Sequence, residues 1–279
     1  MPQLLDTSLP GFAAIACEPK ASLIIVHGLA EYADRYREIA AVLKDRGVSS
    51  FVYDQIGHGD RQGVRTHVHR FEDFVRELNV VARAVRAHEP ARPLFLWGHS
   101  MGSIVAALAA IQSDSPVAGV ITSSNSLEVF RQGTNPLNPF FRLASAVAPR
   151  IRVPLGLDAT KISADQGVQR AYAADPRIPN TASLRLIVEF AKACLYCREV
   201  ARKAFTPWLI IHGEADRIAP PKGSKTLFDL LASTDKKLVV YPSLRHEVHN
   251  ELPAGRAAML ELMTAWIHER ATGVNATRA

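Results

Sequence analysis

Apolar runs and helical segments alternate along most of this chain. Short, continuous apolar runs predict buried strands at 22–26, 48–53, 93–97, 117–122, 208–212 and 237–241, after an edge strand at 11–18. Between them, a 3.6-residue apolar period or a high alanine content predicts helices at 35–46, 71–88, 103–111, 225–232 and 255–271. Strands that alternate with helices are typical of a parallel sheet with helices on both faces, so the sequence predicts an α/β fold.

The stretch 126–205 departs from this alternation. Proline and phenylalanine cluster at 135–141, and later prolines interrupt helical stretches that contain no convincing strand. We therefore predict a core formed by 1–125 and 206–279, and a helical cap inserted at 126–205. The insertion holds 12 basic and 6 acidic residues, which leaves 21 of each elsewhere, so it carries the whole net charge of +6. Such charge indicates either a solvated face, slightly favoured because the charges are dispersed, or attraction to an anionic lipid surface.

Length and cysteine content agree with one large domain in a reducing compartment. The 279 residues, 48% of them hydrophobic, can bury a sizeable core without disulfides. Three cysteines form no disulfide framework, and Cys194 and Cys197 lie one turn apart in a helix-like stretch, which favours apolar packing over a redox or zinc pair. Residues 1–17 lack the features of a secretory signal, and no apolar run could span a membrane. We expect a cytoplasmic protein.

A G-x-S-x-G pentapeptide at 98–102 joins the strand at 93–97 to the helix at 103–111. Strand, tight turn and helix are the setting of a nucleophile elbow, which exposes the hydroxyl of its serine at the top of a sheet. Gly98 and Gly102 fit this interpretation, since a side chain at either position would crowd the converging strand and helix. Ser100 is therefore the candidate nucleophile, although a plain strand-to-helix turn with an incidental serine has the same pattern.

A serine nucleophile needs a base and a group that orients the base. The candidate acid is Asp216, directly after the strand at 208–212, with Glu214 as the rival carboxylate. The candidate base is His246, past the last strand, with His249 as its competitor. Serine, acid and histidine occur in the chain order of an elbow enzyme, and loops after parallel strands meet at the same sheet edge.

The developing oxyanion of an acyl transfer needs donors, for which we select the backbone N–H groups of Met101 and Leu29.

Chemistries that need a cofactor or a metal find less support in the sequence. The glycine-dense loop 57–63 is neither a dinucleotide fingerprint nor a Walker loop. His67 and His69 are interpreted as surface histidines, because no histidine pair brings a third ligand at a metal-site spacing. We expect no metal, no other cofactor and no nucleic-acid partner.

Five short motifs carry a family resemblance. They are H-G-L-A-E at 27–31, G-H-G at 57–59 after Asp54, G-H-S-M-G at 98–102, G-E-A-D-R at 213–217 and H-E-V-H-N-E at 246–251. With them the chain resembles the monoacylglycerol lipase and lysophospholipase group of α/β-hydrolases, which is similar to serine aminopeptidase S33. The resemblance implies an α/β-hydrolase fold with a mobile cap, nucleophile Ser100, acid Asp216, base His246, oxyanion donors Leu29 and Met101, and scaffold residues Glu31, Asp54 and His58. Arg61 departs from the family, which usually has serine two residues after G-H-G.

These motifs predict a serine ester hydrolase that cleaves monoacyl lipid esters through an acyl-enzyme. The alternatives are an esterase or thioesterase for small acyl groups, and a non-catalytic hydrolase fold that binds a ligand under its cap. Between 127 and 157 the insertion has more apolar residues than a complete core requires. We expect an inner apolar face that forms an acyl tunnel, and an outer face that contacts membranes transiently with help from Arg131, Arg142, Arg150 and Arg152.

Overall fold

A seven-stranded sheet runs through the centre of the computed structural model, which describes residues 9–113, 116–131 and 135–276. Its strand order is β1-β3-β2-β4-β5-β8-β9, with β1 antiparallel to β3 and all other neighbours parallel. The strands are β1 (Gly11–Ala14), β2 (Ala21–Val26), β3 (Val48–Tyr53), β4 (Leu94–His99), β5 (Gly119–Ser123), β8 (Trp208–Gly213) and β9 (Lys236–Tyr241). The alternation in the sequence therefore predicted the sheet correctly.

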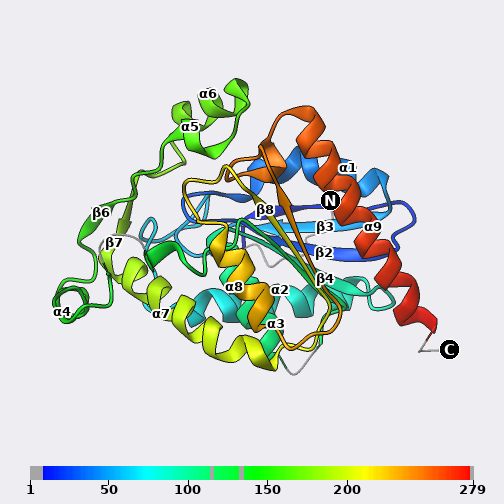
Figure 1. Cartoon of the computed structure of the whole chain (residues 1–279), viewed down its shortest axis with the longest axis horizontal. Helices are drawn as coiled ribbons and strands as arrows, with labels where there is room; N and C mark the ends of the chain where they lie inside the picture. Colours follow the sequence, from blue (N-terminus) through cyan, green and yellow to red (C-terminus); the bar gives the residue numbers. More distant parts are fainter. Residues whose placement is uncertain (1–8, 114–115, 132–134, 277–279) are drawn as a thin grey trace.

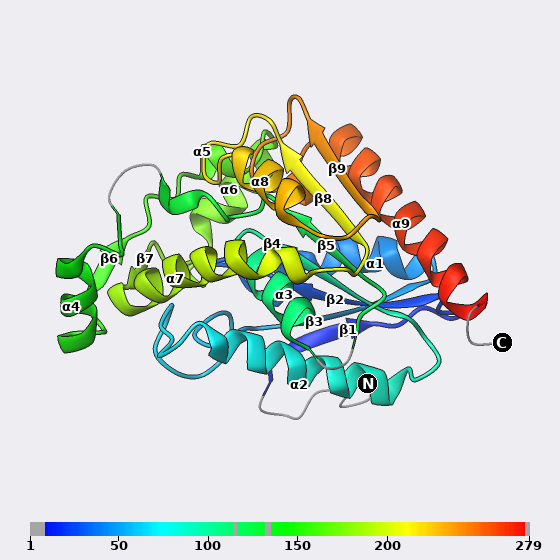
Figure 2. The same cartoon turned by 60° about the horizontal axis from the view of Figure 1, so that its bottom comes forward.

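Helices cover both faces of the sheet (Figures 1 and 2). One face packs against α1 (Arg37–Asp45) and α9 (Pro253–Ala276), whose apolar residues share a buried cluster with outward positions of β2 and β4. The other face packs against α2 (Glu72–His88), α3 (Met101–Gln112) and α8 (Lys222–Leu230). Continuous apolar strands are expected in such a sheet, because side chains on both faces are buried.

In the segment 126–205, the described residues form four α-helices, two short 3-10 helices and one small sheet. Its α-helices are α4 (Pro139–Val147), α5 (Ala159–Ile162), α6 (Gln166–Ala174) and α7 (Leu184–Val200). The expectation that it holds no strand is wrong, since β6 (Arg152–Pro154) pairs antiparallel with β7 (Thr181–Ser183). Strands of three residues are too short to show an alternating pattern, and their pairing joins segments far apart in the sequence.

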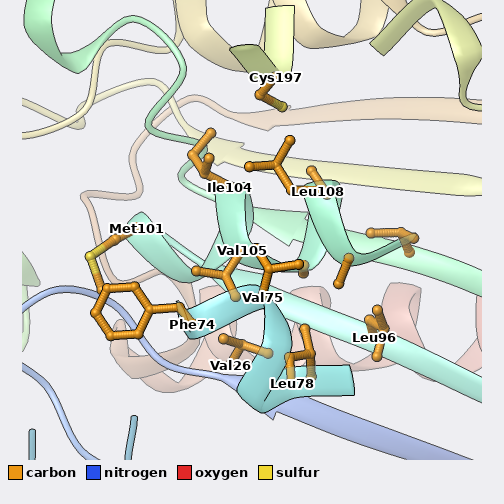
Figure 3. Close-up of a cluster of buried hydrophobic side chains, with 14 of the residues drawn as sticks. Val26, Phe74, Val75, Leu78, Leu96, Met101, Ile104, Val105, Leu108 and Cys197 are labelled. Atoms are coloured by element: carbon orange, nitrogen blue, oxygen red, sulfur yellow. The ribbon is translucent and has the colours of Figure 1, made fainter. Parts of the chain in front are cut away.

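Helix α7 anchors the insertion to the core. Cys194 and Cys197 are buried in the same apolar cluster as α3, and Cys197 lies over Ile104 and Leu108 in Figure 3. Burial raises the pKa of the Cys197 thiol to about 12, so this thiol is protonated and behaves as an apolar group. The interpretation of these cysteines as packing residues is confirmed.

Candidate active site

Ser100 stands in a sharp turn between β4 and α3. Its backbone φ of 51° and ψ of −119° are unusual for a residue with a side chain, a strain typical of functional turns. A Cβ atom on Gly98 would lie 2.2 Å from the carbonyl oxygen of Gly102, and one on Gly102 would lie 2.2 Å from that of Val26. Both glycines are therefore required by close packing, as the sequence predicts.

His246 lies between Ser100 and Asp216, in the loop that follows β9. Its Nε2 atom is 3.1 Å from the Ser100 Oγ, and its Nδ1 is 2.8 Å from an Asp216 carboxylate oxygen. In this arrangement Nδ1–H donates to the carboxylate, and Nε2 is left free to accept the serine proton. The structure thus brings together the three side chains that were selected from separate parts of the sequence.

The Asp216 carboxylate is held as an anion by several donors. One oxygen accepts the backbone N–H groups of Ile218 and Ala219 at 2.8 and 3.0 Å, and the other accepts His246. Burial alone would raise the pKa of Asp216, but His246 and then His212 outweigh it and hold this pKa well below its usual value. Glu214, the rival carboxylate, is exposed and does not contact His246 among the described residues.

His212 is a contact of this site that the sequence motifs did not predict. It is the penultimate residue of β8, and its Nε2 lies 3.1 Å from the Asp216 carboxylate and 3.0 Å from the Ala219 carbonyl. Its Nδ1 lies 2.7 Å from the Ser224 hydroxyl. Two acceptors at Nε2 require the proton there, so His212 donates to Asp216. A histidine at the end of the strand that precedes the acid was the available signal.

The pKa of His246 is raised above its ordinary value. Burial lowers this pKa, but the charge and hydrogen bond of Asp216 raise it by more. A carboxylate that favours imidazolium is suited to a base that must hold a proton during part of a reaction cycle.

Two further serines surround the candidate nucleophile. The Ser126 Oγ lies 3.4 Å from the Ser100 Oγ, and the Ser124 hydroxyl donates to the backbone carbonyl of His246. Both follow β5, which is the neighbour of β4 in the sheet. The run of serine and asparagine at 123–126, directly after a strand, was the signal that could have identified them.

The loop after β2 approaches the nucleophile closely. A Cβ atom on Gly28 would lie 3.0 Å from the Ser100 Cβ, and the Gly28 N–H donates to Glu31 at 3.2 Å. Leu29 lines the same cavity as Ser100. Met101 is the first residue of α3, so its N–H has no acceptor within the helix. Both backbone groups selected as oxyanion donors therefore come from segments adjacent to Ser100.

The residues that the resemblance implies as scaffold are buried and bonded. Asp54 accepts the backbone N–H groups of Ala33 and Asp60 at 2.7 and 2.8 Å. Glu31 accepts the Tyr36 hydroxyl at 2.7 Å, and the Nδ1–H of His58 donates to the carbonyl of Ile56 at 2.9 Å.

Arg61, the departure from the family pattern, has a structural role of its own. Its guanidinium lies 2.6 Å from a carboxylate oxygen of Glu77 in α2. Another oxygen of Glu77 accepts the Ile56 N–H at 3.1 Å. The altered loop is thus fastened to α2.

Of the two histidines predicted at the surface, His67 and His69, only one is exposed. His69 is exposed as expected, but His67 is buried, and its Nδ1 lies 2.9 Å from the Ser183 hydroxyl of β7. The surface assignment of His67 is therefore wrong, because the loop that carries it is covered by the β6–β7 ribbon. Among the residues that the structure describes, no three His, Cys, Asp or Glu side chains gather in a way that could hold a metal ion.

A cavity of about 570 Å³ opens above Ser100 and His246. Its volume is within the usual range of small-molecule sites. The insertion supplies most of its apolar lining, namely Val129, Phe130, Pro136, Phe141, Val153, Pro154, Leu155, Leu157, Ile162, Leu184, Ile187 and Phe190. The polar side chains on the wall include Glu31, Lys161, Tyr172 and Arg217. The site therefore offers a hydrogen-bonded nucleophile in the wall of a largely apolar cavity.

The histidine loop is tied to the inserted region. The N–H of Glu247 donates to the Ile162 carbonyl at 2.8 Å, and the Ser163 hydroxyl donates to the Asn250 carbonyl at 2.7 Å. Glu251 accepts the N–H groups of Arg245 and Ala164 at 2.7 and 3.0 Å. Helix α5 is thereby placed beside His246.

Comparison with known proteins gives consistent results. Residues 17–253 match the family model described as serine aminopeptidase, S33. Monoglyceride lipase of Rattus norvegicus is 30% identical over 90% of this chain and 84% of that protein, and monoacylglycerol lipase of Mycolicibacterium smegmatis is 30% identical over 90% and 89%.

Solved structures resemble the whole fold. A crystal structure of Paleococcus ferrophilus monoacylglycerol lipase has a TM-score of 0.84 at 23% identity, covering 94% of this chain and 99% of that one. A soluble variant of Saccharomyces cerevisiae monoglyceride lipase, in complex with a substrate analog, has a TM-score of 0.83 at 25% identity and covers 95% of both chains.

Proposed function

The chain belongs to the serine aminopeptidase S33 family of α/β-hydrolases, and from this premise we propose that it cleaves monoacyl lipid esters through an acyl-enzyme. The observation that carries the proposal is the hydrogen-bonded series Ser100, His246 and Asp216 at the base of an apolar cavity. A binding pocket needs none of these three side chains, whereas ester hydrolysis needs all of them. The relatives named monoglyceride or monoacylglycerol lipase support a monoacylglycerol as substrate, and a lysophospholipid is the other monoacyl ester that the motifs predict.

In the proposed reaction, the Ser100 oxygen attacks the ester carbonyl while its proton passes to Nε2 of His246. Asp216 holds the Nδ1–H and stabilises the imidazolium. The N–H groups of Leu29 and Met101 receive the oxyanion of the tetrahedral intermediate. Its collapse breaks the bond to the alcohol, which takes the proton from His246 and leaves an acyl group on Ser100. Water, activated by His246, then releases the fatty acid and restores the serine.

The residues at 126–205 act in this proposal as a cap over the acyl chain. Their apolar side chains line the cavity, and α7 fixes them to the core. The volume of about 570 Å³ and the largely apolar lining favour a long acyl chain over the small acyl groups of an ordinary esterase or thioesterase. A series of p-nitrophenyl esters and monoacylglycerols should show kcat/KM rising with chain length, and a preference for acetyl or butyryl esters would favour the alternative.

Covalent labelling tests whether the chain is an enzyme or only binds a ligand. A fluorophosphonate should react once per chain, at Ser100, and Ser100→Ala should abolish both labelling and ester hydrolysis. The matched control is Ser126→Ala, which removes a neighbouring hydroxyl but keeps the nucleophile. A folded protein that does not react would indicate a ligand-binding protein instead.

The cap also has an outer surface suited to transient membrane contact. Phe140, Leu143 and Val147, spaced by three and four residues on α4, are 73%, 66% and 77% exposed. Apolar side chains that share a face of an exposed helix are typical of interfacial contact, and the exposed Arg142 and Arg150 would attract anionic lipids.

Two of the four arginines expected at this surface, Arg152 and Arg131, do not support the membrane contact. Arg152 hydrogen-bonds the Arg65 carbonyl, the Thr66 hydroxyl and the Thr181 carbonyl at 2.6 Å each, so it anchors the β6–β7 ribbon and is engaged in the fold. The side chain of Arg131 lies outside the described residues. No helix in the described part of the chain is long and apolar enough to cross a membrane.

A further inference from the structure

Two cationic side chains line the cavity beside the candidate base. Lys161 lies in α5, and Arg217 directly follows Asp216 in the chain. No carboxylate among the described residues lies within 4.0 Å of either cation. Hydrogen bonds from Thr160, and also the charge of Lys161, lower the pKa of Asp158, but this carboxylate is fully exposed. Lys161, which is partly buried, and Arg217, which is exposed, therefore both border a cavity that also contains the nucleophile, and neither forms an ion pair with a described carboxylate.

Their position corresponds to one particular part of an ester. In the proposed reaction His246 delivers its proton to the departing alcohol, so the alcohol must lie on the His246 side of the cavity. Arg217 is adjacent in sequence to the partner of His246, and the carbonyl of Ile162 accepts the N–H of Glu247 at 2.8 Å. Lys161, the neighbour of Ile162, is thereby held at the same end.

The acyl chain has a separate place. Aromatic and aliphatic walls come from the 3-10 helix Val129–Arg131, α4 and α7, through Phe130, Phe141, Leu184, Ile187 and Phe190. In both Figures 1 and 2, α4 and the start of α7 lie well apart from α5. The aromatic residues of the lining therefore come from other elements than Lys161 and Arg217, and we assign the acyl chain to the former and the alcohol to the latter.

Among the described residues that line the cavity, Glu31 is the one carboxylate, and its oxygens accept hydrogen bonds from groups other than Lys161 and Arg217. It accepts the Gly28 N–H and the Tyr36 hydroxyl, and burial raises its pKa to about 7. A neutral glycerol would leave Lys161 and Arg217 without a partner, whereas a phosphate would accept hydrogen bonds from both. Arginine matches the oxygens of a phosphate in two-point contacts, and lysine adds a second positive charge.

We propose that Lys161 and Arg217 form a subsite for an anionic phosphate on the alcohol part of the substrate. The preferred substrate is then a lysophospholipid with an anionic headgroup rather than a neutral monoacylglycerol. This inference rests on the proposed function, because it assigns the ends of the cavity from the direction of ester cleavage.

The test compares two substrates that share one medium-length acyl chain, a 1-acylglycerol and the corresponding 1-acylglycerol 3-phosphate, both below their micelle concentrations. The measured quantity is the ratio of kcat/KM for the phosphate ester to that for the neutral ester. We expect a ratio above one for the natural chain at low ionic strength, and a decrease as salt screens the charges.

Removing either charge should lower this ratio. We expect Lys161→Gln and Arg217→Gln each to decrease it by about fivefold, the size of one solvent-accessible ion pair. Lys161→Arg, which keeps the charge, should restore it. The matched control is Arg170→Gln, because Arg170 is an exposed cation of the same cap, on α6, that does not line the cavity. A natural ratio below one, or a ratio that neither glutamine variant changes, would overturn the proposal.

A second arm separates a substrate phosphate from the phosphates of surrounding lipids. The neutral ester is presented in vesicles of phosphatidylcholine alone and in vesicles that also contain phosphatidylglycerol. If Lys161→Gln and Arg217→Gln reduce only the stimulation by phosphatidylglycerol and leave the ratio for dispersed substrates intact, the cations bind the membrane surface and the subsite proposal is wrong. Failure of the proposed function would look different, because Ser100 would not be labelled and neither ester would be cleaved.

Discussion

His249 stacks on the ring of Tyr36, with the ring centroids 4.9 Å apart and the planes inclined by 17°. It is fully buried, and its ring also meets the edges of Trp97 and His99. Burial lowers the pKa of His249 well below its usual value, so it is a neutral core residue. The second histidine of the H-x-x-H pair thus supports the histidine loop from below, while His246 faces the nucleophile.

Replacement of His246 or of His249 by alanine should have different effects on activity. His246→Ala removes the proposed base and should decrease kcat/KM by about 10⁴-fold or more, by analogy with other serine hydrolases. His249→Ala should keep substantial activity but lower the melting temperature, because it leaves a cavity in the core. Steady-state kinetics and thermal unfolding of both variants test this. Loss of turnover in a folded His249→Ala variant, with activity retained in His246→Ala, would show that the base is wrongly assigned.

The two carboxylates after β8 should also differ. Asp216→Asn keeps the shape but removes the charge that pairs with His246, so we expect a severe loss of kcat with the fold intact. Glu214→Gln changes an exposed side chain and should have a mild effect. Measurement of kcat, with circular dichroism as a check of folding, decides between them, and a larger loss for the Glu214 variant would contradict the assignment.

The acid limb of the pH profile should reflect the raised pKa of His246. The base must be neutral to accept the serine proton, so kcat/KM should fall as the pH decreases through this pKa, which lies above the ordinary histidine value. In Asp216→Asn the largest raising influence is removed, and burial then dominates. The midpoint of the residual activity should therefore move to lower pH. A midpoint that does not move would mean that another group controls the limb.

Arg35 and Glu247 form a buried ion pair that should contribute to stability. Two guanidinium nitrogens of Arg35 donate to the two carboxylate oxygens at 2.7 Å each, and the Glu247 side chain is fully buried. Arg35→Gln should lower the free energy of unfolding by about 3–5 kcal/mol, because it leaves a buried carboxylate unpaired. Urea unfolding measures this loss. The matched control is Arg256→Gln, which breaks a more exposed pair with Glu38 and should cost less than about 1 kcal/mol.

The neighbouring residues Phe140 and Phe141 should separate membrane contact from substrate binding. Phe140 is 73% exposed, whereas Phe141 lines the cavity. Phe140→Ser should weaken sedimentation with anionic vesicles and lower activity on long-chain monoacylglycerol in vesicles, with little change on a short soluble ester. Phe141→Ser should lower kcat/KM for long acyl chains even when they are dispersed. If the Phe140 variant lost equal activity on both substrates, its role would be packing and the membrane proposal would fail.

Local patterns were sufficient to determine the framework of this protein. The apolar runs between turn residues predicted the strands, because a parallel sheet buries both faces of each strand. The glycines around Ser100 predicted the sharp turn, since only residues without a side chain fit where β2, β4 and α3 converge. The ends of β4, β8 and β9 predicted that a serine, a carboxylate and a histidine would meet, because parallel strands present their carboxyl ends at one edge.

The tertiary structure decided matters that depend on contacts between distant segments. Pairing of β6 with β7 places residue 152 opposite residue 183. The resulting ribbon buries His67 and brings Arg152 into hydrogen bonds with the loop before α2. The sequence had predicted both side chains at the surface. The choice between His246 and His249 depends on which ring faces Ser100 and which stacks on Tyr36. The family resemblance already implied His246, but the physical reason for the choice lies in contacts between side chains that are far apart in the chain.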